Sequence, residues 1–494
     1  MIPIVADEAY FVGWGSQLSA GYYDHPPLTG WISWFLTRFS ESGYVHRFFS
    51  FLLGILSTYL IYRFVRQKHD TDTASYIAVF FLLLPANIIV FSIFTNDTIL
   101  YFAMLLFFLS FSQALRFYST KSTISYWYAA FSGLSFGLAL LIKYSASIYF
   151  LAITFFLIIN WKSFSGFLFR QYFLMSVISA AIFSSNLLWN YNNCAVNLAF
   201  NFLFRQSETS LIGVLELVIA LFVLVGPVAF VLCYKRIRSL PSIIQVFRYT
   251  SHSFFTQTLL TTLIVVAIIA FFRGKFSTHW GLPLIILATL AIAENIHILK
   301  IEKILSRRFL FISTLFTIFL GMFFLLKTYP QLSLHIAGER SAFRFAQIVD
   351  IENRSLLENI ERDHADKILA TSSYGTSSML ANNTRLPTTV IFNSTSKYGR
   401  NHDIFENYAA YDGKDFLFLE TKPKADRLKS LMTYFEKSSI IELNGDNGRY
   451  LALVGESFKF DKYRDEQIQR TLDTLYDRIP PWLYRSCFME KYDR

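Results

Sequence analysis

The sequence has 494 residues, of which 53% are hydrophobic and only 16% are charged. A soluble protein carries about a quarter charged residues, so an ordinary soluble enzyme, a disordered chain, a collagen-like chain and a small disulfide scaffold are excluded. The charges are concentrated at the end, where 47 of the 167 residues over 328–494 are charged. The composition therefore predicts three parts: a loop over 1–43, a membrane part over 44–327, and a water-soluble domain over 328–494.

The net charge of +10 follows the membrane part and does not indicate a nucleic-acid partner. The soluble part holds 23 Lys and Arg residues against 24 Asp and Glu residues, so the positive excess lies in the first 327 residues. Cations in the loops between spans are what membrane orientation requires. We therefore expect the chain to contact lipid and no nucleic acid.

The segment 1–43 carries acidic residues outside any apolar span. Asp7 and Glu8 are adjacent, and Asp24 is followed by His25. Carboxylates at a membrane surface serve as a general base or hold a divalent metal ion. The structural alternative is that Asp7 caps a helix and Asp24 stabilises a turn.

Aromatic residues and prolines surround these acids. Tyr22 and Tyr23 precede Asp24, and two prolines open an apolar stretch over 28–39 that contains two tryptophans. The stretch 8–20 is weakly amphipathic, and both stretches are typical of helices that lie in the membrane interface. We expect the two tyrosines and the neighbouring histidine to contact a substrate.

Ten apolar segments of about 20 residues are long enough to cross a bilayer as helices. They lie at roughly 44–62, 74–94, 97–117, 126–142, 144–160, 171–190, 211–234, 254–272, 280–299 and 309–327. Alternate connections carry 15 of the 22 Lys and Arg residues of the membrane part. The positive-inside rule places those connections in the cytoplasm, so the N-terminal segment and the C-terminal part face outward.

The first five residues, Met-Ile-Pro-Ile-Val, are typical of the end of a helix that has just left the membrane. No signal peptide or span precedes Asp7, although the segment around it is predicted outside. We therefore expect one N-terminal span to be missing upstream. The alternative is a short N-terminus that lies outside from the start.

Ionisable residues at the outward ends of the spans are scarce, so each has its own interpretation. Asp97, which follows Asn96, either caps the next helix or contributes its acid to a site. Lys143 ends an apolar run and either binds an anionic head group or extends its amine to the interface.

Two outward loops carry further candidates. Arg273, Lys275 and His279 lie in one short loop, and two cations with a histidine are good phosphate ligands unless the loop is simply solvated. The loop 191–208 is rich in asparagine and aromatic residues and carries Arg205. Its amides and rings suit a sugar, although an aromatic belt at the interface explains them equally well.

The C-terminal part alternates short β-like runs with helical stretches, which predicts a small α/β domain. Strands are expected at KILATSS (367–373), TTVIF (388–392), DFLFLE (415–420) and RYLALVG (449–455), and helices over 374–383 and 423–436.

This part contains no nucleotide-binding loop, zinc spacing or nucleophile elbow. His364, His402 and Asp403 follow no pattern and are expected at the surface. The three cysteines of the chain form no motif, and a bridge between Cys194 and Cys487 is left open.

Several motifs resemble one enzyme family. DEAYF followed by GYYDHPPLTGWI is the specific signal, and Asn96-Asp97-Thr98, LLIKYSA, LLWNYNN, KFSTHWGLP, ILATSSYGTSSMLA and YDGKDFLFL extend it over nearly the whole chain. The sequence resembles the polyprenyl-phosphate-sugar-dependent glycosyltransferases with the C-type membrane fold, which are bacterial relatives of protein O-mannosyltransferases and of the lipid A aminoarabinose transferase. The resemblance implies a polytopic α-helical membrane protein of the inner membrane with an extracytoplasmic α/β domain.

The resemblance also implies roles for the candidate residues. Asp7 becomes the catalytic base, and Glu8 and Asp24 shape the same site, either directly or by holding a divalent metal ion. The donor phosphate is expected at four residues of the outward loops, Lys143, Arg273, Lys275 and His279. The donor is a hexose or pentose on polyprenyl phosphate, so no nucleotide is needed, and the acceptor is lipid A or another envelope glycolipid, with a protein hydroxyl second.

Two other classes compete with a transferase. A transporter or flippase of lipid-linked sugars predicts charges or broken helices near the middle of the bilayer. A structural membrane protein does not need the acidic outward loop. Most polar residues of the membrane part gather at its outward surface, which favours the enzyme.

The 15-to-7 division of the cations predicts the side on which the chain ends. Alkaline phosphatase fused after Arg494 should be active, because this reporter folds only outside the cytoplasm. A cytoplasm-only reporter at the same place is the control, and activity of that reporter instead would contradict the topology.

Overall fold

The computed structural model describes residues 4, 6–40, 43–204, 209–225, 253–274, 278–295, 354–384, 386–393, 399–420, 425–445 and 448–492. The chain forms two compact units. The α/β unit comprises Met1–Gly43, Leu187–Arg205 and Met322–Arg494, and the helical unit comprises Tyr44–Asn186 and Gln206–Gly321. These units are defined by contacts within the chain, whereas the boundaries predicted at 43 and 327 separate the membrane part from the soluble parts. Those boundaries therefore stay a prediction.

The helical unit is built from apolar helices at nine of the ten predicted spans, and the tenth, 309–327, lies outside the described residues. These are α3 (Gly43–Val65), α4 (Thr71–Leu83), α5 (Pro85–Ser92), α6 (Asn96–Ser119), α7 (Ile124–Leu140), α8 (Ser147–Ile159), α9 (Trp161–Phe167), α10 (Phe173–Tyr191), α12 (Leu211–Val225), α15 (Phe254–Arg273) and α16 (Leu282–Glu294).

Four helices in the described part of the chain are long and apolar enough to cross a membrane, or up to five if the bent pair α4 and α5 counts as one span. That pair bends by 64° where Leu84 is extended before Pro85, because a proline disfavours helical backbone in the residue before it. Several apolar spans are therefore confirmed, and the count of ten stays a prediction.

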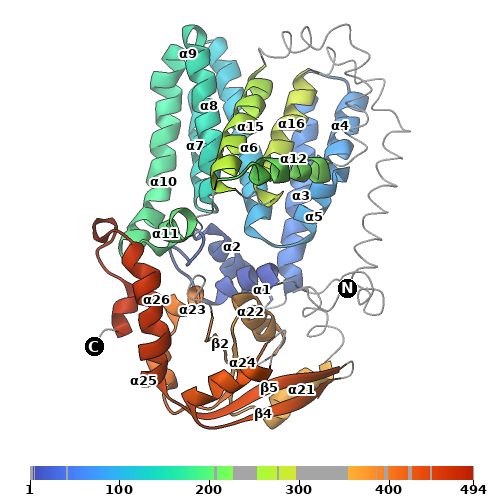
Figure 1. The fold of residues 1–494 in the computed structure, drawn as a ribbon. Helices are drawn as coiled ribbons and strands as arrows, with labels where there is room; N and C mark the ends of the chain where they lie inside the picture. The colour runs from blue at the N-terminus through green and yellow to red at the C-terminus, as the bar shows by residue number, and fades with distance from the viewer. Residues whose placement is uncertain are drawn as a thin grey trace. The chain divides into compact units, whose positions relative to one another are not determined.

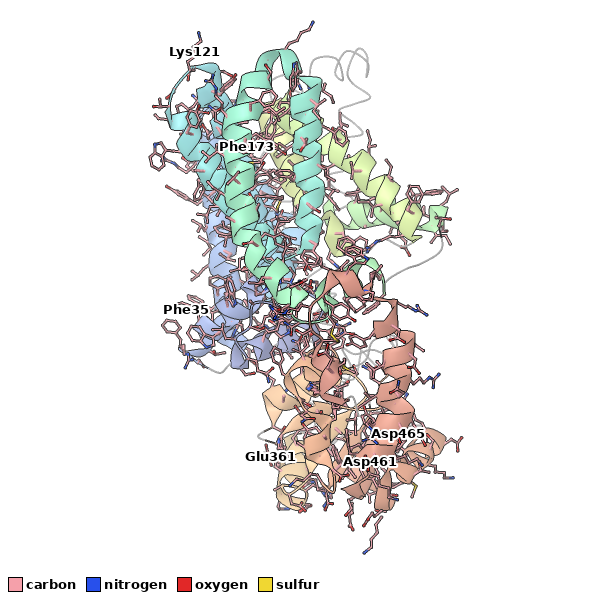
Figure 2. All side chains as sticks on the ribbon, turned by 90° about the vertical axis from the view of Figure 1, so that its left-hand side faces the viewer. Phe35, Lys121, Phe173, Glu361, Asp461 and Asp465 are labelled. Atoms are coloured by element: carbon pink, nitrogen blue, oxygen red, sulfur yellow. A yellow bond between two sulfur atoms is a disulfide. The ribbon has the colours of Figure 1, made fainter. Side chains whose placement is uncertain are left out.

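Small residues bring two helices of this unit close together. A Cβ atom added at Gly133 of α7 would lie 2.7 Å from the backbone oxygen of Met175 in α10, and one at Gly137 would lie 2.9 Å from Ile182. Close approach at small residues is a common way for helices to associate in lipid, where no hydrophobic force drives them together. Figure 2 shows Phe173 of α10 pointing outward, and its side chain is 65% exposed, as lipid contact requires.

The α/β unit contains a mixed five-stranded sheet in the order β2-β1-β3-β5-β4. The strands are β1 (Ile368–Thr371), β2 (Thr388–Val390), β3 (Phe416–Leu419), β4 (Phe435–Gly445) and β5 (Gly448–Phe458). β1 runs parallel to β2 and β3, whereas β5 is antiparallel to both β3 and β4. The four predicted strands are present. β4 is an additional edge strand, which the sequence does not predict because polar residues such as Glu436 and Lys437 interrupt its hydrophobic pattern.

The helices of this unit are α1 (Ala6–Gly13), α2 (Leu28–Thr37), α11 (Val196–Phe202), α21 (Arg354–Asp363), α22 (Tyr374–Asn383), α23 (Asn401–Phe405), α24 (Ala425–Leu431), α25 (Phe460–Tyr463) and α26 (Gln469–Thr474), with a 3₁₀ turn η1 (Trp14–Ser16). The helix predicted over 374–383 is present. The one predicted over 423–436 is shorter, because β4 begins at Phe435.

Alternation along the strands gives the sheet two buried faces. Leu369 and Leu417 belong to one hydrophobic cluster, and Ala370 and Phe418 belong to another. Ala9 of α1 joins the first cluster, and α11 joins the second. Figure 1 shows α1 beside α22. Packing on both faces explains why three distant segments of the chain form one unit.

A disulfide between Cys194 and Cys487 connects two of these segments, with a Cα–Cα distance of 4.3 Å. The Cys194 amide also donates to the Ser486 carbonyl at 2.9 Å. The bridge that the sequence left open is therefore present, and bridges of this kind persist in oxidising compartments.

Candidate functional site

The acidic pair of the N-terminal segment, Asp7 and Glu8, lies in the first turn of α1. The positive end of the helix dipole stabilises carboxylates at this position. Asp7 is the second residue of α1 and is exposed to solvent, whereas Glu8 is fully buried. The Asp7 carboxylate accepts a hydrogen bond of 2.9 Å from the Tyr374 hydroxyl at the start of α22. Asp7 is thus a solvent-accessible acid in a defined orientation.

Tyr374 is itself held by its neighbours. The Arg400 guanidinium lies 3.6 Å from the centre of its ring, and the Tyr10 ring packs edge-on at 4.8 Å. Burial, with a smaller contribution from Asp7, raises the pKa of the Tyr374 hydroxyl above its ordinary value. The hydroxyl therefore stays protonated and remains a donor to Asp7 near neutral pH.

Asp24 and Arg400 form a buried ion pair. One Asp24 oxygen accepts from the Arg400 Nη1 atom at 2.7 Å, and the other accepts from the Tyr10 hydroxyl at 3.2 Å. The Asp24 and Arg400 side chains are 3% and 8% exposed. Burial works against the charge of Arg400, but Asp24 together with Tyr374, Tyr10 and Asp7 outweighs burial and raises the pKa of the guanidinium.

This pairing favours a structural role for Asp24 over the predicted catalytic one. Both of its oxygens are engaged, and a carboxylate already neutralised by a guanidinium is a poor base and a poor metal ligand. Among the described residues no three His, Cys, Asp or Glu side chains gather to hold a metal ion. The donor set at Asp24 does not fit the expected divalent metal, and no step proposed below depends on one.

Tyr22 and Tyr23 are both fully buried, and their predicted contact with substrate stays a prediction. The Tyr22 ring stacks on Trp14 at 4.0 Å, and a Cβ atom added at Gly30 would lie 2.1 Å from its hydroxyl. Tyr23 packs in the core beside Phe200. These rings fill the interior beneath the acidic loop.

His25 is half-buried, with its ring 6.0 Å from that of Phe11.

The asparagine-rich segment before Arg205 donates hydrogen bonds to the backbone of the acidic loop. Asn197 donates to the Tyr22 carbonyl at 2.8 Å, and Asn201 donates to the Asp24 carbonyl at 2.9 Å. These amides, which suited a sugar, are therefore engaged inside the protein. Arg205 lies outside the described residues.

Asp403 is fully buried, so its predicted surface position is wrong. One carboxylate oxygen accepts from the Gly399 amide at 3.1 Å and from the Tyr408 hydroxyl at 3.2 Å. Burial raises the pKa of the Asp403 carboxyl well above its usual range. Its neighbour His402 is half-buried and pairs with Glu406 at 2.5 Å.

In the helical unit, Lys143 pairs with Asp97 at 2.7 Å. Thr95 is the N-cap of α6, so Asp97 lies in the first helical turn and does not cap it. Lys143 is 8% exposed and lies between α7 and the 3₁₀ turn η2 (Tyr144–Ala146). An amine held by a carboxylate inside the protein does not extend to the interface, so simple snorkelling does not describe Lys143. Its predicted contact with a donor phosphate stays a prediction.

The second group of predicted phosphate ligands is described in part. The Arg273 guanidinium, at the end of α15, lies 5.4 Å from the centre of the Trp280 ring. His279 is exposed beside the same tryptophan. Lys275 lies outside the described residues.

Sequence reasoning missed Tyr10, Tyr374 and Arg400, which together position both acids. Their partners lie up to 376 residues away in the chain, so no local pattern could identify them. One weak indication of a role for Tyr374 is present in the sequence, because this residue lies in ILATSSYGTSSMLA, a segment that contributes to the family resemblance.

Comparisons with known proteins support that resemblance. Residues 24–189 match the family model for dolichyl-phosphate-mannose-protein mannosyltransferase. The fold is similar to that of ArnT from Cupriavidus metallidurans in the apo state, with a TM-score of 0.56 and 12% identity over 92% of this chain and 94% of that chain. The same ArnT bound to undecaprenyl phosphate gives a TM-score of 0.55 and 12% identity over 91% and 93%. No curated protein matches the chain by sequence.

The buried ion pair generates a stability prediction. Asp24→Asn leaves the Arg400 guanidinium buried without a countercharge, which should cost about 3–5 kcal/mol of the free energy of unfolding. Denaturation of the purified protein in detergent measures the loss. A double variant, Asp24→Leu with Arg400→Met, should recover most of it, and an unchanged stability of Asp24→Asn would contradict the assignment.

Proposed function

We propose that this protein is a membrane glycosyltransferase that transfers a sugar from a polyprenyl-phosphate carrier to an envelope acceptor outside the cytoplasm. The match of residues 24–189 to a mannosyltransferase family model and the fold similarity to ArnT support this proposal. The observation that carries the proposal is Asp7, an exposed carboxylate oriented by the Tyr374 hydroxyl. The fold shared with an ArnT structure that holds undecaprenyl phosphate supports the choice of carrier.

Asp7 is proposed as the general base. Transfer breaks the bond between sugar and phosphate and forms a bond from the sugar to an acceptor oxygen, whose proton must leave. An exposed carboxylate can accept that proton, whereas Asp24 is committed to Arg400. The Tyr374 hydrogen bond to one Asp7 oxygen fixes the direction in which Asp7 presents the other, which limits the entropy lost on reaching the reactive geometry.

Lys143 is proposed to bind the donor phosphate, together with Arg273, His279 and Lys275. Cleavage leaves negative charge on the phosphate, and preplaced cations stabilise that charge. The Asp97 carboxylate holds the Lys143 amine in a defined position inside the protein until a phosphate takes its place. Exchange of one anionic partner for another avoids leaving the amine buried alone.

Lipid A or another envelope glycolipid is the proposed acceptor, and a protein hydroxyl is second. The Cys194–Cys487 bridge supports a location of the α/β unit in an oxidising compartment, which for a bacterial inner-membrane protein is the periplasmic side. No nucleotide pool exists there, so a lipid-linked donor is the suitable one.

Asp7→Asn should abolish transfer and leave donor binding intact. The amide keeps the size of the side chain but removes its basicity, so turnover should fall by about 10²–10⁴-fold. Transfer of labelled sugar from the polyprenyl carrier measures the effect. Asp465→Asn, at an exposed acid of the same unit (Figure 2), is the matched control. Near-normal turnover of well-expressed Asp7→Asn would refute the base.

Lys143→Ala and Asp97→Asn separate phosphate binding from a structural ion pair. Loss of a charged contact costs about 1.5–3 kcal/mol, so Lys143→Ala should weaken apparent donor affinity by about 10- to 150-fold. Asp97→Asn removes the competing anion and should leave donor affinity equal or higher. If both variants instead lose stability equally and keep donor affinity, the pair is structural.

A further inference from the structure

The α/β unit contains a large cleft that the proposed chemistry does not use. Its volume is about 1030 Å³. One wall comes from α1, η1 and α2, and the other comes from α21, α22 and α23. Neither Asp7 nor Asp24 is among its lining residues.

The lining combines flat aromatic rings with amides. Trp34 offers an indole face, and Gln17, Asn382 and Asn383 offer both donors and acceptors. Gln17 and Asn382 are exposed, so their amides can turn toward a ligand. Rings that stack on the apolar face of a sugar, flanked by amides that pair with its hydroxyls, are suited to carbohydrate.

Two buried polar atoms on opposite walls add an independent sign of a ligand. Among the residues that the structure describes, the Trp14 Nε1 atom and the Ser377 Oγ atom have no hydrogen-bond partner, and their residues are 3% and 1% exposed. Both residues line the cleft. Buried polar groups without a partner are costly, and a small rotation of either side chain toward the cleft would let hydroxyl groups of a bound molecule satisfy the indole donor and the serine.

The charge of the lining restricts the type of carbohydrate. Glu358, Glu361 and Glu406 line the cleft, against one Arg38 and a histidine that is paired with Glu406. The Arg38 guanidinium also lies over the Trp34 ring at 4.6 Å. An excess of carboxylates disfavours phosphate groups and favours neutral or amine-bearing sugars. Among the proposed acceptors, this lining therefore favours a glycolipid with an unphosphorylated saccharide over lipid A, whose glucosamine disaccharide carries phosphates.

The cleft shares its walls with the elements that hold Asp7. Asp7 and Tyr10 lie on α1, and Tyr10 lines the cleft; Tyr374 and Ser377 lie on α22, and Ser377 lines it as well. We propose that the cleft binds a neutral or amine-bearing saccharide portion of the acceptor and so delivers the acceptor hydroxyl to Asp7. The identification of this saccharide as part of the acceptor depends on the proposed function, whereas saccharide binding itself does not.

The test uses the purified full-length protein in detergent and three probes. These are an N-acetylglucosamine trimer, a glucosamine dimer with free amines, and a glucosamine disaccharide that carries two phosphates. Saturation-transfer NMR titrations should give binding of the first two and at least about tenfold weaker binding of the third. Trp34→Ala and Asn382→Ala should each weaken binding by about tenfold, which is the loss of roughly one stacking or hydrogen-bonding contact.

Trp482→Ala is the matched control, since Trp482 is 79% exposed on the same unit and does not line the cleft. Absence of binding for all three probes, unchanged binding in both cleft variants, or preference for the phosphorylated probe would each overturn the proposal. Asn382 is exposed, so its variant should fold even if Trp34→Ala does not.

Release of polyprenyl phosphate from the donor in the absence of acceptor separates the two proposals. This hydrolysis depends on the proposed transferase activity and requires no saccharide in the cleft. A wild-type protein that binds the saccharides but never turns over donor would refute the proposed function and leave the cleft assignment standing. Normal hydrolysis without saccharide binding would refute the cleft alone.

Discussion

The buried Asp24–Arg400 ion pair is the interaction on which the α/β unit depends. Two charges removed from water remain in place only if each neutralises the other, so the N-terminal loop and the residues around Arg400 cannot separate without a large penalty. The same guanidinium lies over the Tyr374 ring, and Tyr374 donates to Asp7. One buried charge pair therefore orients an exposed carboxylate at a distance, through an aromatic ring.

The surroundings of Asp24, Asp7 and Asp97 differ, although the three residues look alike in the sequence. Asp24 is enclosed and neutralised, so it stabilises the fold. Asp7 is exposed and accepts a hydrogen bond from the neutral Tyr374 hydroxyl, so it keeps its capacity to accept a proton. Asp97 is engaged with Lys143 in the helical unit. Environment, not residue type, separates structural from chemical acids in this protein.

Three distant segments form the α/β unit because the central sheet has two apolar faces. α1 covers one face, and the segment that contains α11 covers the other, where asparagines donate to the backbone of the acidic loop. The disulfide from Cys194 to Cys487 adds a covalent connection across 293 residues. The acids thus rest on a rigid, two-sided core, which is the support that a positioned base needs.

The sequence by itself determined the membrane class, the positions of the apolar helices, four of the five strands, and the candidates Asp7 and Lys143. These follow from local hydrophobicity, alternation and the scarcity of charge in lipid, all of which are properties of short stretches. Only the tertiary structure decided that Asp24 is paired, that Tyr22 and Tyr23 are core residues, that Asp403 is buried, and that Tyr374 orients Asp7. Those outcomes depend on partners that lie hundreds of residues apart, and nothing in a local pattern specifies which distant side chain will neutralise a buried charge.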